Sequence, residues 1–183
     1  MHSSLDGGNF MPISITDALE SYPDIQRVLV PTHPGRSFDV YNTYDPPAEA
    51  EEVSQYWNLD TLPRDLFDLW RSARECRLHH DRGLGKDGIT LLSPPKAREV
   101  TERELEFWDD EDGRFLKSDI IIGTMVVEPD FIVFDTRKND FNVLLASTLD
   151  GREDWPIVGR NISDFLLRYR DLPGESHWQR SIV

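Results

Sequence analysis

The residues best suited to chemistry lie together in one short segment, 76–81 (CRLHHD). It contains the single cysteine of the chain, Cys76, and two adjacent histidines, His79 and His80. Thiolate and imidazole are preferred zinc ligands, and a cysteine next to a histidine can act as a nucleophile with its base. If the segment is a strand, Cys76 and His80 share one face while His79 points to the other.

Neither chemistry is completed elsewhere in the sequence. Structural zinc usually takes two ligand pairs from separate segments, and His2, His33 and His177 form no second pair. No sequence feature supplies an orienting group or an oxyanion hole. We therefore predict no metal, no cofactor and no catalytic residue, and expect a buried, hydrogen-bonded histidine here. A hydrolase that uses Cys76 and His80 is the enzymatic alternative.

Two loops resemble ligand-binding loops without meeting their patterns. Residues 83–88 (GLGKDG) lack the four-residue gap of a phosphate loop and the Ser or Thr after its lysine. In residues 108–113 (WDDEDG), alignment on the invariant glycine of a calcium loop puts Trp108 at the first ligand position and Asp119, not Glu, at the last. We interpret the first as an ordinary loop and the second as an acidic surface turn.

The net charge of −14 limits the classes of partner. Residues 1–60 carry −8, residues 61–100 carry +2, and residues 101–183 carry −8. A phosphate backbone or an anionic lipid surface repels such a chain, which argues against nucleic acid and membrane as partners. A basic protein is the partner that this charge attracts.

Tryptophans next to acids are the best candidates for contacts with a partner, because tryptophan dominates binding hot spots. The alternative is that the tryptophans are core residues and the acids keep the chain soluble. The predicted partner-binding residues are Trp108, Asp109, Asp110, Glu111, Asp112, Asp154, Trp155, Glu49, Glu51 and Glu52.

The central element is a predicted hairpin over residues 119–136. Its two apolar, β-branched runs are separated only by 128–130 (EPD), a connection short enough to close an antiparallel pair. Ile120, Ile121 and Ile122 are apolar on both pleat faces, so both faces of this strand should be covered. Gly123 predicts a bulge or a close approach of another backbone.

The remaining elements predict one α+β domain, residues 14–183, with a mainly antiparallel sheet flanked by helices after a flexible tail, 1–13. Helices are expected from 15 to 29 with an interruption at Pro23, over 48–57, from Leu62–Pro63 to 73, over 101–108, and after an Asn161 cap. Strands are expected at 76–80, 89–92 and 143–147, with a short edge strand at 38–41. Without a signal peptide or an apolar run of membrane-spanning length, we expect a cytoplasmic protein.

In this order the elements resemble the SUKH superfamily, known from a fungal regulator of cell-wall synthesis and from many bacterial proteins. The likeness spans about residues 48–169 and does not include the segment before Ala48. The residues that carry it are Leu62–Pro63 entering a helix, the strand 89–92 followed by 93–95 (SPP), the step Ile122–Gly123, the aromatic return strand ending in Asp135, and Ser163, Phe165 and Leu166 of the last helix.

The resemblance implies a non-enzymatic role, most often as an immunity protein that binds and neutralises a cognate secreted toxin. The acidic composition agrees with an inhibitor of a basic protein such as a nuclease toxin. The alternative is a regulatory scaffold that binds a cellular enzyme or signalling protein, as the fungal relative does.

Overall fold

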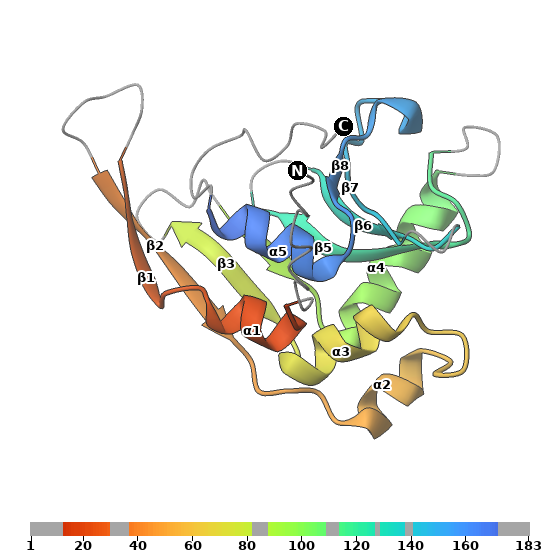
Figure 1. Cartoon of the computed structure of the whole chain (residues 1–183). Helices are drawn as coiled ribbons and strands as arrows, with labels where there is room; N and C mark the ends of the chain where they lie inside the picture. Colours follow the sequence, from red (N-terminus) through yellow and green to blue (C-terminus); the bar gives the residue numbers. More distant parts are fainter. Residues whose placement is uncertain are drawn as a thin grey trace, which may run out of the picture.

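The computed structural model describes residues 13–29, 37–81, 88–108, 114–126, 129–137 and 141–171. Within them, eight strands form one antiparallel sheet in which every strand pairs with its neighbours in sequence (Figure 1). Helices accompany this sheet, so the predicted α+β class is confirmed. The predicted tail, apart from Ile13, lies outside the described residues.

The strands are β1 (Ile25–Leu29), β2 (Ser37–Tyr44), β3 (Cys76–Asp81), β4 (Ile89–Leu91), β5 (Asp119–Met125), β6 (Phe131–Asp135), β7 (Val143–Ala146) and β8 (Ile157–Gly159). The helices are α1 (Ile15–Glu20), α2 (Ala50–Tyr56), α3 (Arg64–Ser72), α4 (Pro94–Phe107), the 3-10 turn η1 (Arg152–Asp154) and α5 (Ile162–Arg170).

The predicted central hairpin is confirmed as β5 and β6, which pair in antiparallel register. The register shifts between Ile121 and Gly123, where the expected bulge lies. A Cβ at Gly123 would lie 3.0 Å from the carbonyl oxygen of Thr90 and 3.2 Å from Cβ of Ile132. Glycine is therefore needed here because neighbouring strands approach too closely for a side chain.

Helices α1, α3 and α5 lie together on one side of the sheet (Figure 1). Leu66, Leu69 and Trp70 of α3 are buried, as the apolar stripe predicted, and the Trp70 indole donates to the Leu92 carbonyl at 2.9 Å. The Asn161 side chain accepts from the Asp164 N–H at 2.8 Å, which confirms the predicted cap of α5.

Helix α4 begins at Pro94, seven residues before the predicted start at Thr101. We expected the helix to start only after Pro94 and Pro95, but proline suits the first turn of a helix, where its missing N–H costs nothing. Thr101 therefore lies in the middle of α4. Strand β4 pairs only with the second half of β5, and beyond it the Thr101 hydroxyl accepts from the Ile121 N–H at 2.9 Å. This helix thus replaces a missing strand at the edge of β5.

Three other predictions differ from the structure. Residues 25–29 form strand β1, not the second half of a helix, because α1 ends at Glu20, before Pro23, and the chain then pairs with β2. The predicted edge strand at 38–41 is part of the longer β2, which is internal because β1 pairs with its outer side. Strand β8 was not predicted. It has three residues, too few to show a hydrophobic period.

Candidate protein-binding surface

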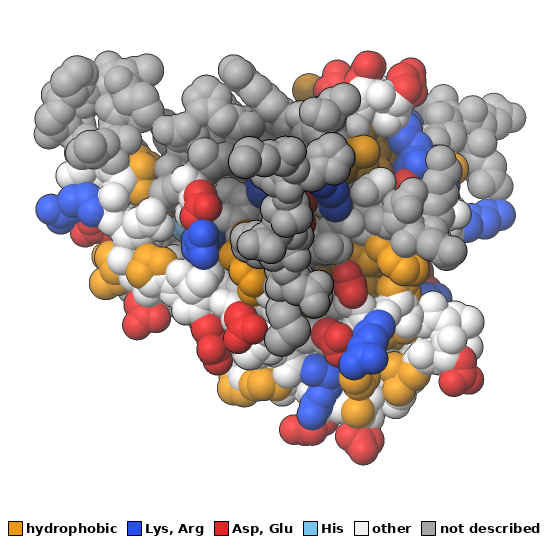
Figure 2. All heavy atoms as spheres, in the orientation of Figure 1, with side chains coloured by type: hydrophobic (Ala, Val, Ile, Leu, Met, Phe, Trp, Pro, Cys, Tyr) orange, Lys and Arg blue, Asp and Glu red, His pale blue; other side chains and the backbone are white. Residues whose placement is uncertain are grey.

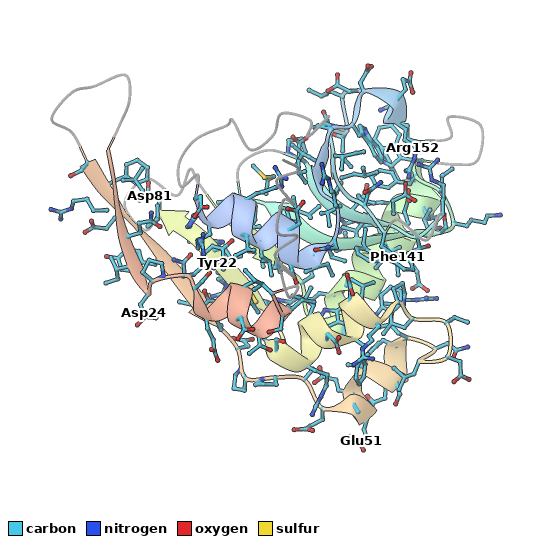
Figure 3. All side chains as sticks on the ribbon, viewed as in Figure 1. Tyr22, Asp24, Glu51, Asp81, Phe141 and Arg152 are labelled. Atoms are coloured by element: carbon cyan, nitrogen blue, oxygen red, sulfur yellow. The ribbon has the colours of Figure 1, made fainter. Side chains whose placement is uncertain are left out.

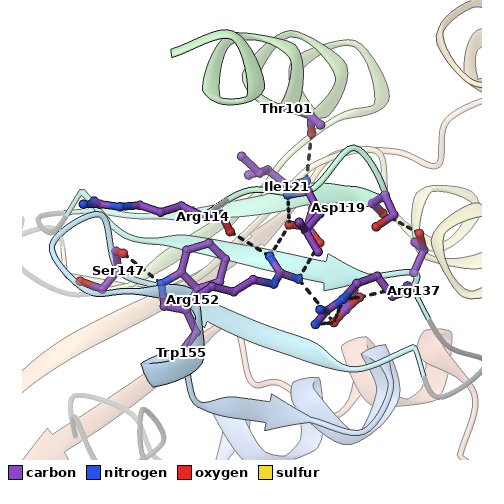
Figure 4. A network of polar contacts seen from close by, with 12 residues as sticks. Thr101, Arg114, Asp119, Ile121, Arg137, Ser147, Arg152 and Trp155 are labelled. Carbon is purple, nitrogen blue, oxygen red and sulfur yellow. Dashed lines mark hydrogen bonds and ion pairs between the residues drawn. The ribbon is translucent and has the colours of Figure 1, made fainter. Parts of the chain in front are cut away.

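After β7 the chain turns back over the sheet, and Arg152 of η1 reaches two carboxylates there (Figure 4). Its guanidinium donates to both oxygens of Asp119, at 2.8 Å for Nη2 to Oδ1, and lies 3.4 Å from Asp135. Arg137 makes hydrogen bonds of 2.6–3.1 Å to the same Asp135. The network ties η1 to the adjoining ends of β5 and β6.

For both Asp119 and Asp135, burial raises the pKa of the carboxyl group and hydrogen bonding lowers it. Burial raises the pKa of Asp119, and the hydrogen bonds from Arg152 and the Leu116 N–H offset only part of that rise. Burial also raises the pKa of Asp135, but the hydrogen bonds from Arg137 and the charges of Arg137 and Arg152 together outweigh it, so this pKa is lowered overall. Removing a partner from such a buried pair is costly, so the network holds η1 firmly in place.

Trp155 follows η1 and is buried, with 5% of its surface exposed. Its indole donates to the Ser147 carbonyl at 3.1 Å, and its ring lies 4.9 Å from the Phe115 ring. The Arg152 guanidinium carbon lies 5.1 Å from the centre of the same indole. Trp155 is therefore a buried residue that packs beneath the η1 turn.

Arg114 joins this turn to the end of α4. Its guanidinium carbon lies 4.3 Å from the centre of the Trp108 ring, while Nη1 donates to the Thr148 carbonyl at 2.7 Å. Its own carbonyl accepts from Arg152 at 3.1 Å. Trp108 is half-buried, and its indole lies 3.3 Å from a carboxylate oxygen of Glu104.

Two apolar side chains stand out from this end of the molecule. Phe107 is 73% exposed and Leu149 is 85% exposed, more than any other large apolar residue described. The Phe107 ring packs edge-on against Trp108 at 5.0 Å. Neither side chain is part of the described hydrophobic core, so both are available for contact with another protein.

Three acids follow Leu149 closely in the sequence. Asp150, Glu153 and Asp154 are exposed, and none forms an ion pair with a described residue. Figure 2 shows red acidic side chains gathered over the η1 turn, at the top right. We call this group the α4–η1 surface: Phe107, Trp108, Leu149, Asp150, Glu153 and Asp154.

The structure brings some of the predicted partner-binding residues together and separates others. Trp108 and Asp154 belong to the α4–η1 surface, and Trp155 supports it, while Asp109, Asp110, Glu111 and Asp112 lie outside the described residues. Glu49, Glu51 and Glu52 lie at the start of α2, at the other end of the molecule (Figure 3). Glu49 pairs with Arg71 at 3.1 Å and Glu52 with Arg74 at 2.7 Å.

Sequence reasoning missed Phe107, Leu149, Asp150 and Glu153. The buried positions of α4 are 94, 97, 101 and 104, a helical period that leaves Phe107 off the buried stripe. This period of buried positions can be recognised only if the helix is taken to begin at Pro94. Leu149 is the one apolar residue in the polar segment 147–151 (STLDG), which was a usable signal.

The predicted alignment of Cys76 and His80 on one face is wrong. An extra residue, His79, bulges out of β3 with φ of 53° and donates its N–H to the Asn42 side chain at 2.8 Å. The bulge reverses the alternation, so His80 shares the face of Arg77 and Thr90, opposite Cys76. Burial raises the pKa of the Cys76 thiol to about 12, so a reactive thiolate is not supported.

The histidines differ in their hydrogen bonds. The His80 ring lies 3.0 Å from the Ile89 carbonyl but is only half-buried, so it does not fully match the predicted buried, hydrogen-bonded histidine. His79 is fully buried between the rings of Tyr22 and Tyr169, at 5.4 and 4.8 Å, and neither ring nitrogen has a hydrogen-bond partner within the described structure. Burial lowers the pKa of His79 to about 4.

A groove lies between α1, α3 and the start of α5. This groove has a volume of about 650 Å³ and three carboxylates, Asp65, Asp68 and Asp164. Asp68 pairs with Arg64 and Asp164 with Arg168. Because arginines already neutralise two of its three acids, the groove is a weaker candidate for a basic partner than the α4–η1 surface.

Among the described residues, no group of histidine, cysteine and acidic side chains is placed to hold a metal ion. None of the helices that can be described has the length and apolar character needed to cross a bilayer. Comparison of this chain with protein-family models, curated proteins and solved structures finds no match.

Proposed function

We propose that this chain is a non-enzymatic immunity protein that binds and neutralises a cognate secreted toxin, a basic protein such as a nuclease. The observation that carries the proposal is the α4–η1 surface. Phe107 and Leu149 project from it, with Asp150, Glu153 and Asp154 alongside. Exposed apolar side chains that a partner can bury, with charged residues nearby, suit a protein-binding site.

The two kinds of side chain would contribute differently. Burial of Phe107 and Leu149 against the toxin would provide most of the binding energy and slow dissociation. The unpaired acids would increase the association rate with a basic partner, and this contribution would weaken as salt rises.

The support beneath the surface favours tight binding. Arg152, Arg114 and Trp155 join η1, α4 and the sheet through hydrogen bonds and ring contacts (Figure 4). A surface held in place before binding loses less conformational entropy when the complex forms. Inhibition would follow from occupation of the toxin's basic groove, where carboxylates would replace the phosphates of its substrate.

The test is to purify the full chain with the product of a toxin gene encoded beside its own. We expect the two proteins to co-elute in size-exclusion chromatography, and cells that express the chain to survive the toxin. Absence of both co-elution and protection would remove the proposal. Stable recovery of a cellular enzyme or signalling protein, with no toxin gene nearby, would instead support the regulatory-scaffold alternative.

A further inference from the structure

The strand β1 lies at the margin of the sheet, and within the described part of the chain it pairs with β2 alone (Figure 1). An edge strand has one row of backbone N–H and C=O groups that its own sheet does not use. Proteins commonly protect such edges with proline, bulges, charged side chains or a covering element, and the one charged residue of β1 is Arg27. No described helix lies along the outer side of β1, and its sequence, IQRVL, contains neither proline nor glycine.

The register identifies which groups face outward. The Asn42 N–H donates to the Asp24 carbonyl at 2.9 Å, so residue 24 faces β2. Because this orientation alternates along a strand, Gln26 and Val28 also face β2, where they lie opposite Val40 and Phe38. The N–H and C=O groups of residues 25, 27 and 29 therefore point away from the sheet.

The side chains add a chemical preference to this edge. Ile25 is 56% exposed on the same face of the sheet as Arg27. The Arg27 guanidinium uses Nε to bind Asp39 at 3.1 Å, which leaves its terminal nitrogens without a partner among the described residues. Arginine has five donors, so it can bind a second carboxylate from the outer side.

A second copy of the chain fits this edge poorly. The antiparallel register that uses all three outward positions places residue 25 opposite 29 and Arg27 opposite Arg27 of the copy. Like charges directly opposite each other destabilise a strand pair. A partner strand with a carboxylate opposite Arg27 would instead stabilise the strand pair.

We propose that β1 is a docking edge for an extended segment of another protein, which adds an antiparallel ninth strand to the sheet with Asp or Glu opposite Arg27 and an apolar residue beside Ile25. The interaction is independent of the α4–η1 surface, because Asp24 at the start of β1 and Arg152 lie at opposite sides of the molecule (Figure 3). Backbone hydrogen bonds supply affinity, and the two side chains supply selectivity.

The test selects displayed random peptides of about nine residues, long enough to cover one strand, against the full chain. We expect enrichment of alternating apolar sequences with one acidic residue, and NMR of the complex should show slowed amide exchange at Ile25 and Arg27. The variant Arg27→Pro removes an outward N–H and the Arg27 guanidinium with its ion pair to Asp39, but leaves the β1–β2 backbone hydrogen bonds intact. It should weaken binding roughly tenfold or more. Selection against Arg27→Glu should enrich a basic residue instead.

Four results would overturn the proposal. They are the absence of any enriched peptide, equal binding to Arg27→Pro, a binding site that NMR places away from β1, and dimerisation of the chain with protection of the same amides. The last would assign the edge to a second copy. If Arg27→Pro does not fold, the exchange of the Ile25 and Arg27 amides in the unmodified chain decides between these results. Toxin binding is measured separately, so a failure here leaves the proposed immunity function standing.

Discussion

Arg152 donates hydrogen bonds from two guanidinium nitrogens to the two carboxylate oxygens of Asp119, joining η1 to the first residue of β5. The Asp119 side chain is 1% exposed and the Arg152 side chain 11% exposed, so the pair is largely removed from water. Burial raises the pKa of Asp119 and the hydrogen bond from Arg152 opposes that rise, so Arg152 favours the ionised carboxylate.

Replacement of Arg152 should therefore be strongly destabilising. Arg152→Ala leaves Asp119 buried without its partner, which we expect to cost about 3–5 kcal/mol. Arg137→Ala is the matched control, because Arg137 is 47% exposed and its loss leaves Arg152 in place. Urea unfolding measures both free energies. A cost for Arg152→Ala no greater than for Arg137→Ala would contradict the structural role of the pair.

The hydroxyl group of Thr101 should contribute more to the stability of the fold than the volume of its side chain does. Thr101→Val keeps the shape of the side chain but removes the acceptor for the buried Ile121 N–H, at an expected cost of about 1–3 kcal/mol. Thr43→Val on the exposed side of β2 should change stability by no more than about 0.5 kcal/mol. Thermal unfolding of the two variants compares them directly, and equal melting temperatures would count against α4 as the substitute for a missing strand.

Two glycines should respond very differently to alanine. A Cβ at Gly159 would lie 2.8 Å from the backbone nitrogen of Phe165, so helix α5 would have to move off β8. A Cβ at Gly151 meets only the end of the flexible Glu153 side chain. We expect Gly159→Ala to lose about 1–3 kcal/mol, or to fail to fold, and Gly151→Ala to remain close to the unmodified chain. Circular dichroism during urea unfolding distinguishes the two, and a stable, fully folded Gly159→Ala would show that the contact is looser than described.

His79 should make stability depend on acid. Its pKa is about 4 in the folded state against 6.5 for a free side chain, so between these values the unfolded chain binds more protons. Stability should therefore fall as the pH falls from about 6.5 to 4, by up to about 3 kcal/mol. His79→Phe should remove most of this slope, while His80→Gln, at a half-buried site, should remove less. Urea unfolding across that pH range would disprove the assignment if the slope survived in His79→Phe.

Features decided by neighbouring residues were the ones that could be predicted from the sequence. The β5–β6 hairpin follows from two apolar runs around a short turn, and the Asn161 cap from one side chain and the N–H three residues later. Features decided by distant partners could not be predicted. The His79 bulge depends on Asn42, and Arg152 meets Asp119 only after the chain has turned back over the sheet.

The α4–η1 surface likewise has features that could be predicted from neighbouring residues and features that could not. The combination of acids and aromatic residues at 108–112 and 154–155 was visible in the sequence, but which aromatic side chains are exposed was not. Trp155 lies inside because Phe115 and the Ser147 carbonyl hold it there, while Phe107 lies outside because α4 starts at Pro94. Both facts depend on contacts or boundaries that a local pattern does not contain.

The most direct test of the account is the dissociation constant of the complex with the toxin, measured by isothermal titration calorimetry. We predict that Phe107→Ala and Leu149→Ala each weaken binding roughly tenfold or more, as expected for hot-spot residues. Leu59→Ala, at an exposed leucine after α2, should leave the constant unchanged. Unchanged affinity in both Phe107→Ala and Leu149→Ala would contradict binding through the α4–η1 surface.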